Sequence, residues 1–225
     1  ASSSSGGGRG LGGAIVGTGT VSHSTFTDNF AQVGGAIAYV EAVTHSTFTG
    51  NHADWSGGAI SGVGSVTNST FSSNSAGYTY GGGYGGAIEV GSNPLMVSNS
   101  TFTNNHARWA AGSGGVGGGI YVSYGETLTV THSTFAGNIA DYDGGGIFNG
   151  RGTLTLQNPI VANSVMANNC FNDFGHVIDG GGNLSYPDTT CPGINADPKL
   201  GPLQDNGGPT HTMAPGPGSA AIDAA

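Results

Sequence analysis

The chain has 225 residues, of which 45 are glycine, and it carries 4 basic against 13 acidic residues, for a formal net charge of −9. A glycine inside a helix costs about 1 kcal/mol relative to alanine, so glycine at this frequency excludes helices as the main scaffold. Four basic residues are too few to neutralise a phosphate backbone, which makes nucleic acid a poor partner. The sequence has no run of 18 apolar residues that would span a membrane.

The first segment, residues 1–10, reads ASSSSGGGRG. It has neither the basic head nor the apolar stretch of a signal peptide, so we expect a secreted chain whose signal peptide has been removed. The segment is rich in glycine and serine, and we expect it to be flexible. It offers no amphipathic helix of the kind that caps the end of many repeat proteins.

Residues 11–165 contain two motifs that recur together at a period of 22 to 32 residues. The first is Gly-Gly-Ala-Ile or its glycine variant, with isoleucine at Ile15, Ile37, Ile60, Ile88, Ile120 and Ile147. The second is Ser-Thr-Phe-x-x-Asn, with phenylalanine at Phe26, Phe48, Phe71, Phe102 and Phe135, and Ile160 in the sixth copy. An asparagine follows three residues later, at Asn29, Asn51, Asn74, Asn105, Asn138 and Asn163. A period of this length indicates a stacked architecture.

Each repeat holds three short apolar segments separated by glycine-rich turns, as one turn of a parallel β-solenoid requires. The residue after each isoleucine varies from Val16 to Glu89, so it points outward, and the isoleucine and phenylalanine point inward. With successive turns about 4.8 Å apart, we expect an isoleucine column, an aromatic column and a ladder of asparagine amides.

Residues 166–225 hold seven of the nine prolines and both cysteines. We expect an irregular cap in which Cys170 and Cys191 form a disulfide, provided that the protein meets an oxidising environment. Two free thiols are the alternative.

The repeats GGAIAYVEAVTHSTFTGN and GGAISGVGSVTNSTFSSN resemble the GGAI and FxxN repeats of polymorphic outer-membrane proteins and related surface β-helices. The tail DPKLGPLQDNGGPTHTMAPGPGSAAIDAA is similar to that of bacterial and archaeal surface proteins with a choice-of-anchor Q domain. These resemblances imply a secreted protein exposed at a cell surface. They also imply the fold that we predict, an all-β right-handed parallel β-helix (β-solenoid) of about six turns with an irregular C-terminal cap.

Threonines flank the repeat phenylalanines and are expected to face outward, at Thr25, Thr27, Thr47, Thr49, Thr70, Thr101, Thr103 and Thr134. A flat array of this kind resembles the ice-binding face of some antifreeze proteins. Threonine also suits any exposed strand, because its methyl group packs against neighbouring side chains.

Other polar residues suggest weaker sites. Asp141 and Asp143 are the only close pair of carboxylates within the repeats and are a weak calcium candidate, although a solvated turn is the simpler interpretation. His23 and His45 share a repeat position with His132, where a metal site is the alternative to a polar turn residue. Asn-x-Ser/Thr sequons, which are possible N-glycosylation sites, begin at Asn68, Asn99 and Asn183.

We interpret the sequence as a non-enzymatic extracellular structural protein that needs no cofactor, either a filament subunit or an adhesive β-helix. The two ends of the solenoid differ, which favours head-to-tail contact between copies of the chain. Surface glycans are a second possible partner. An ice-binding protein is one alternative. A carbohydrate-active β-helix enzyme is another, against which the scattered carboxylates and scarce basic residues argue.

Overall fold

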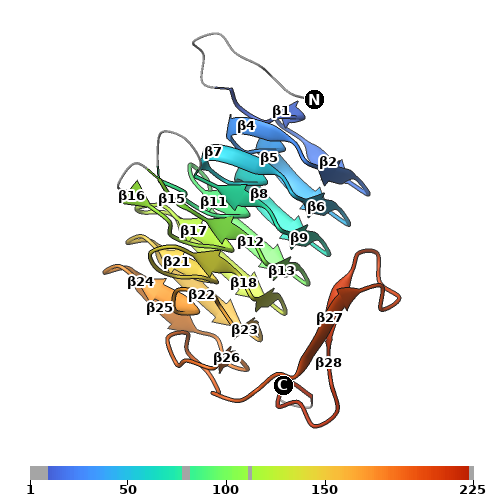
Figure 1. Ribbon diagram of the computed structural model, residues 1–225, viewed down its shortest axis with the longest axis vertical. Coiled ribbons are helices and arrows are strands. Elements are labelled where there is room, and N and C mark those ends of the chain that lie inside the picture. The colour runs from blue at the N-terminus through green and yellow to red at the C-terminus, as the bar shows by residue number, and fades with distance from the viewer. Residues whose placement is uncertain (1–9, 78–81, 111–112, 223–225) are drawn as a thin grey trace.

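A computed structural model describes residues 10–77, 82–110 and 113–222 of the chain. Within these residues the regular secondary structure consists of strands alone. The strands stack as successive turns of a parallel β-helix (Figure 1), so the predicted all-β fold is confirmed. Nine of the ten residues of the expected flexible segment, residues 1–9, lie outside the described residues.

Three sheets form the wall of the solenoid, and every strand pairing within them is parallel. The large sheet contains β1 (Ile15–Val16), β2 (Thr20–Ser22), β5 (Ile37–Thr44), β8 (Ile60–Thr67), β11 (Ile88–Val90), β12 (Leu95–Ser98), β17 (Ile120–Val122), β18 (Thr127–Thr131), β21 (Ile147–Asn149), β22 (Thr153–Gln157), β24 (Cys170–Asn172) and β25 (His176–Asp179). The threonine sheet contains β3 (Thr25–Thr27), β6 (Thr47–Thr49), β9 (Thr70–Ser72), β13 (Thr101–Thr103), β19 (Thr134–Ala136), β23 (Ile160–Ala162) and β26 (Leu184–Tyr186). The corner sheet contains β4 (Phe30–Val33), β7 (His52–Ser56), β10 (Ser75–Ala76), β14 (His106–Ala107) and β20 (Ile139–Ala140).

Two antiparallel pairs of strands complete the described structure. The short pair β15 (Trp109–Ala110) and β16 (Ser113–Gly114) projects from the wall of the solenoid beyond β14. The second pair, β27 (Leu200–Gln204) and β28 (Thr212–Pro215), is a C-terminal hairpin that runs alongside the stack (Figure 1).

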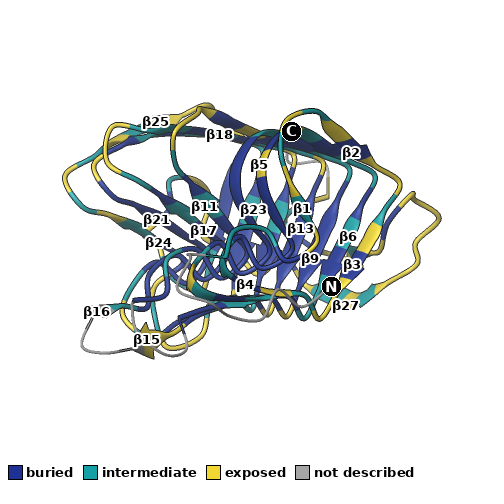
Figure 2. Cartoon of the chain, turned by 90° about the horizontal axis from the view of Figure 1, so that it is seen from above, coloured by how far each residue is buried: buried dark blue, intermediate teal, exposed yellow. Residues whose placement is uncertain are grey.

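The core consists of columns of like side chains from successive turns. Ile37, Ile60, Ile88, Ile120 and Ile147 are fully buried, and Ile15 in the first turn packs half-buried against them. The rings of Phe26, Phe48, Phe71, Phe102 and Phe135 stack with centroid separations of 4.6 to 4.9 Å. This separation is the spacing of adjacent strands, so the register of the backbone sets the ring stacking. Viewed down the stack, buried residues line the interior of the coil (Figure 2).

A ladder of asparagine amides runs beside the phenylalanine column. The side-chain Nδ2 of Asn51 donates to Oδ1 of Asn74 at 2.9 Å, and the same contact recurs between the other neighbours from Asn29 to Asn138. Each Nδ2 from Asn51 onward also donates to a phenylalanine carbonyl of the preceding turn. The ladder thereby satisfies backbone groups at a buried turn.

The sixth turn departs from the predicted alignment. Phe135 pairs with Val161, and Ile160 pairs with Thr134, so the alignment of Ile160 with the phenylalanine column was wrong by one residue. Asn163 consequently lies outside the ladder and is exposed, with a positive φ of 55°. The equivalent of Asn138 is Ser164, whose backbone N–H donates to Oδ1 of Asn169.

A ladder of serine hydroxyls, which the sequence did not lead us to predict, precedes the phenylalanine column. The backbone N–H of each serine before the last donates to the hydroxyl of the serine one turn on, and each serine hydroxyl donates to the carbonyl two residues before its own position. The serines are Ser24, Ser46, Ser69, Ser100 and Ser133. The ladder ends where Pro159 occupies this position, because proline has no hydroxyl.

The solenoid has a seventh turn, made by β24, β25 and β26. These strands pair with β21, β22 and β23 of the sixth turn. Cys170 takes the isoleucine position and Ser185 the phenylalanine position. The boundary predicted at residue 165 was therefore too early, because both marker residues of the last turn are replaced.

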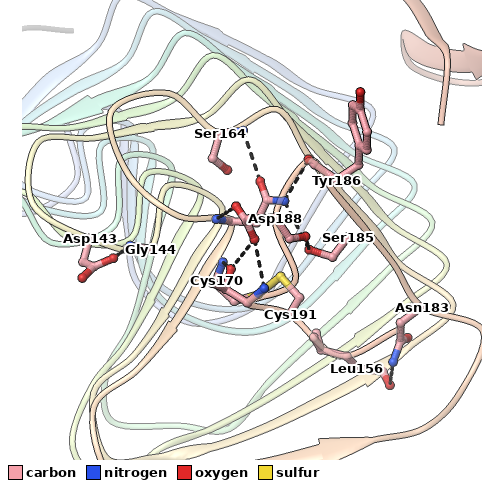
Figure 3. The surroundings of a disulfide bond; sticks show 12 residues. Asp143, Gly144, Leu156, Ser164, Cys170, Asn183, Ser185, Tyr186, Asp188 and Cys191 are labelled. Atoms are coloured by element: carbon pink, nitrogen blue, oxygen red, sulfur yellow. Dashed lines mark hydrogen bonds between the residues drawn. A yellow bond between two sulfur atoms is a disulfide. The ribbon is translucent and has the colours of Figure 1, made fainter. Parts of the chain in front are cut away.

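Residues 187–196 cover the end of the core after this last turn. Cys191 forms a disulfide with Cys170, and both cysteines are buried (Figure 3). The carboxylate of Asp188 accepts hydrogen bonds from the backbone N–H groups of Asn169 and Thr190. The C-terminal end of the solenoid is thus closed by its own chain.

The C-terminal hairpin lies against the threonine sheet. The hydroxyl of Thr70 donates to the carbonyl of His211 at 2.6 Å, and the hydroxyl of Thr210 donates to the carbonyl of Asn68 at 3.3 Å. These contacts join residues more than 140 positions apart. The hairpin therefore returns from the seventh turn to the third.

Candidate binding surface

The threonine array does not form one open face. Thr25 and Thr27 are exposed, but Thr70, Thr101 and Thr103 are buried. Thr47, Thr49 and Thr134 are half-buried. Thr70 faces outward, as predicted, but the expectation of an open array was wrong for the central turns, where Thr70 contacts the C-terminal hairpin and Thr101 and Thr103 are buried. An ice-binding plane needs a flat exposed surface, and the exposed part is confined to the first turns.

The carboxylates of Asp141 and Asp143 have separate partners within the chain. Asp141 accepts hydrogen bonds from Nε2 of His106 and from the backbone N–H of Trp109. Asp143 accepts one from the backbone N–H of Gly144. Calcium takes six to eight oxygen ligands, and no group of three or more acidic, histidine or cysteine side chains suited to a metal occurs among the described residues.

The rings of His23 and His45 stack with centroids 4.8 Å apart. Both residues have a positive φ, as do His132, Asn68 and Asn99 at the same repeat position. Histidine and asparagine are enriched in this left-handed conformation. The backbone of the turn therefore accounts for the residue types at this position.

The three glycosylation sequons differ in their accessibility. Asn183 is 3% exposed, and its Nδ2 donates to the carbonyl of Leu156 and the carboxylate of Asp179. The folded chain does not offer this side chain to a glycosylating enzyme, so the prediction for Asn183 was wrong. Asn68 is half-buried with its amide against His45, whereas Asn99 is exposed.

The most distinctive surface lies where the corner sheet leads into the large sheet. Trp55, Trp109 and Tyr142 form what we name the aromatic corner, and they are 37%, 47% and 59% exposed. Trp55 and Trp109 are the only tryptophans of the chain. The rings of Trp109 and Tyr142 lie 5.3 Å apart, centroid to centroid.

The register of the corner sheet explains this gathering of aromatic side chains. His52, Ser75, His106 and Ile139 pair in successive turns. Trp55, Trp109 and Tyr142 each follow a member of this set by three residues. Tyr78 has the same position in the sequence and lies outside the described residues. Of the described aromatic residues, Trp109 and Tyr142 lie on adjacent turns with their rings in contact, and Trp55 lies two turns before Trp109 in the stack.

Charged groups adjoin the aromatic corner. Nε2 of His106 lies 2.7 Å from Oδ1 of Asp141, and the backbone N–H of Trp109 donates to the other carboxylate oxygen. Burial alone would raise the pKa of Asp141, but the hydrogen bonds from His106 and Trp109 and the charge of Arg108 outweigh it and lower the pKa. Asp141 is thereby held ionised and fixes the start of the projecting loop that carries Trp109.

For His52, unlike Asp141, burial decides the direction of the pKa shift. Burial lowers the pKa of His52, and the nearby charge of Arg108 lowers it further against the opposing effect of Asp54. His52 is therefore held neutral at neutral pH, and its Nδ1 lies 2.7 Å from the hydroxyl of Ser75.

Exposed tryptophan and tyrosine beside arginine is the composition of contact hot spots on protein surfaces. These side chains supply a large contact area at a low cost in conformational entropy. The sequence pattern that marks the corner is an aromatic residue three positions after the first residue of β7, β10, β14 and β20, although β4 has Val33 there; we did not recognise this pattern in the sequence. The structure places Asp141 at this corner, where it accepts hydrogen bonds from His106 and from the backbone of Trp109.

Among the residues that the structure describes, none belongs to a helix of the length and apolar character needed to cross a membrane.

The model of the Chlamydia polymorphic membrane protein repeat matches residues 45–63, 99–123 and 132–150, all within the solenoid. No curated protein and no solved structure matches the chain. The matched segments include the Ser-Thr-Phe motifs of the second, fourth and fifth turns and the glycine-rich motifs that follow them. The chain is thus a parallel β-helix built from repeats that are similar to those of polymorphic membrane proteins.

Proposed function

We propose that this chain is an extracellular, non-enzymatic adhesive β-helix whose aromatic corner makes contact with a protein on another surface. The observation that carries the proposal is the exposure of Trp55, Trp109 and Tyr142 on turns of the corner sheet, with the rings of Trp109 and Tyr142 in contact. Large exposed aromatic side chains are costly to leave in water, and in binding surfaces they supply most of the affinity. The similarity to the polymorphic membrane protein repeat supports a location at the cell surface.

The closed C-terminal end favours an adhesive role over a filament. Head-to-tail stacking needs an open edge at both ends of the solenoid. Residues 187–196 cover the last turn, and the disulfide of Cys170 and Cys191 holds them there. We therefore expect the purified chain to sediment as a monomer, and concentration-dependent fibres in electron micrographs would contradict this proposal.

A cell-binding assay tests the adhesive role directly. The fluorescently labelled chain is titrated onto intact epithelial cells and bound label is measured by flow cytometry, beside a variant with W109A and Y142A. Two hot-spot side chains at about 2 kcal/mol each predict binding roughly 1,000-fold weaker. Tyr124 is 78% exposed on a different loop, and Y124A is the matched control. Equal binding of the double variant and the control would refute the proposal.

A further inference from the structure

A second surface feature lies on the outer face of the large sheet, at Tyr39. Its φ is 60°, a left-handed conformation that is unusual for a bulky residue. The residues on either side of Tyr39 pair with Ser61 and Val63, so Gly62 lies opposite Tyr39 in the next turn, and its φ is 71°. The fold thus accepts glycine at this bend, yet the second turn carries a strained tyrosine. Strain of this kind is concentrated at functional sites.

Glycine on the neighbouring turn lets the tyrosine ring lie against the sheet. A Cβ on Gly62 would come within 2.8 Å of Cδ1 of Tyr39. The ring is therefore seated directly on the backbone of the third turn, and 43% of the residue remains exposed. One side of the ring is supported by protein and the rest is available to a ligand.

The ring borders a groove of about 420 Å³ that crosses the first four turns. Thr18 lines it from the first turn, Tyr39 and Glu41 from the second, Gly64 from the third, and Asn93 with Pro94 from the fourth. Because Gly64 has no side chain, no side chain from the third turn fills the middle of the groove. Its volume is within the range of small-molecule sites.

Within the part of the chain that the structure describes, the polar side chains that line the groove have no other hydrogen-bond or ion-pair partners. These side chains belong to Thr18, Tyr39, Glu41 and Asn93. Together they offer hydroxyl, carboxylate and amide groups, which both donate and accept. Neither of the two ion pairs within the described chain involves Glu41.

We propose that this groove binds a neutral pyranose unit of a glycan. The apolar face of the sugar packs on the ring of Tyr39, and its hydroxyls donate to Glu41 and exchange hydrogen bonds with Asn93 and Thr18. The carboxylate of Glu41 and the net charge of −9 disfavour acidic sugars. This site is distinct from the aromatic corner and shares no residue with it.

Saturation-transfer NMR on the full chain tests the site, with maltose, cellobiose, lactose and diacetylchitobiose as probes. We expect transfer to at least one of these sugars, and at least tenfold weaker binding of that sugar by Y39A and by E41Q. Y124A, which changes an exposed tyrosine elsewhere, is expected to bind like the unaltered chain, as is the double variant of the aromatic corner. Thermal unfolding of Y39A confirms that the variant is folded, and E41Q provides a second test that leaves the strained backbone unchanged.

Several results would overturn the inference. One is the absence of transfer to every sugar in the panel, and another is equal affinity in Y39A, E41Q and Y124A. A third is a preference for sialyllactose over lactose, since the carboxylate of Glu41 would repel it. Choline tests the rival occupant, because an aromatic ring beside a carboxylate also suits an organic cation. Binding of choline with no sugar binding would assign the groove to cations.

Discussion

Replacing Asn74 by alanine tests the asparagine ladder as a source of stability. The side chain is fully buried, and its Nδ2 donates to the carbonyl of Phe48 at 3.0 Å and to Oδ1 of Asn105 at 2.9 Å. Its Oδ1 accepts from the backbone N–H and the Nδ2 of Asn51 at 3.0 and 2.9 Å. N74A removes all four contacts at once.

The magnitude follows from which groups keep a partner. Oδ1 of Asn105 still accepts from the backbone N–H of residue 74, and Nδ2 of Asn51 still donates to the carbonyl of Phe26. The backbone N–H of Asn51 and the carbonyl of Phe48 lose their amide contacts in a buried place. At about 1–3 kcal/mol for each of these two groups, N74A should lower the free energy of unfolding by roughly 2–6 kcal/mol.

Urea denaturation followed by circular dichroism measures this loss. Asn168 is exposed and its side chain makes no hydrogen bond among the described residues, so N168A is the matched control and should stay within about 0.5 kcal/mol of the unaltered chain. If N74A lost less than about 1 kcal/mol relative to N168A, the ladder would not carry the stability assigned to it here.

Two further predictions concern the C-terminal end and the pH dependence of stability. Replacing both Cys170 and Cys191 by alanine removes a crosslink with a sequence separation of 21 and should lower the free energy of unfolding by about 3 kcal/mol. Amide hydrogen exchange should become faster in β24–β26 but not in β5. Equal exchange rates in β24–β26 of the variant and of the unaltered chain would contradict this. Burial raises the pKa of Asp143 above its usual 3.8, so its ionised form destabilises the folded chain once the pH exceeds that raised pKa. D143N should therefore be more stable than the unaltered chain at pH 7, and this gain in stability should vanish below pH 3.8. Thermal unfolding across this pH range measures the gain, with E41Q, at an exposed position, as the control. A gain in stability that persists at low pH would contradict the raised pKa of Asp143.

The sequence was sufficient to predict the stacked architecture, because its markers are physically constrained. Side chains such as those of Ile60 and Phe71 fill the core, which runs continuously through all the turns. A substitution in one turn is felt by both neighbours, so the pattern repeats strictly. The phenylalanine, isoleucine and asparagine positions therefore recur in register through the first five turns and could be predicted from the sequence.

The prediction failed where this constraint weakens. In the last turn Cys170 and Ser185 replace the large marker residues, and Cys170 is joined to Cys191 of the cap. The covering of Thr70 depends on a hairpin that folds back from a distant part of the chain, and no local pattern encodes that contact. The burial of Asn183 follows from the same unmarked seventh turn.

The C-terminal hairpin changes how this solenoid should lose its structure. In an ordinary repeat array each turn touches only its neighbours, and the ends fray progressively. Here His211 and Thr210 contact Thr70 and Asn68 in the third turn. The third to seventh turns are therefore linked at both ends, by the solenoid itself and by the C-terminal hairpin. These turns should melt as one cooperative unit, while the first two turns, which lie outside this linked part, open and close independently.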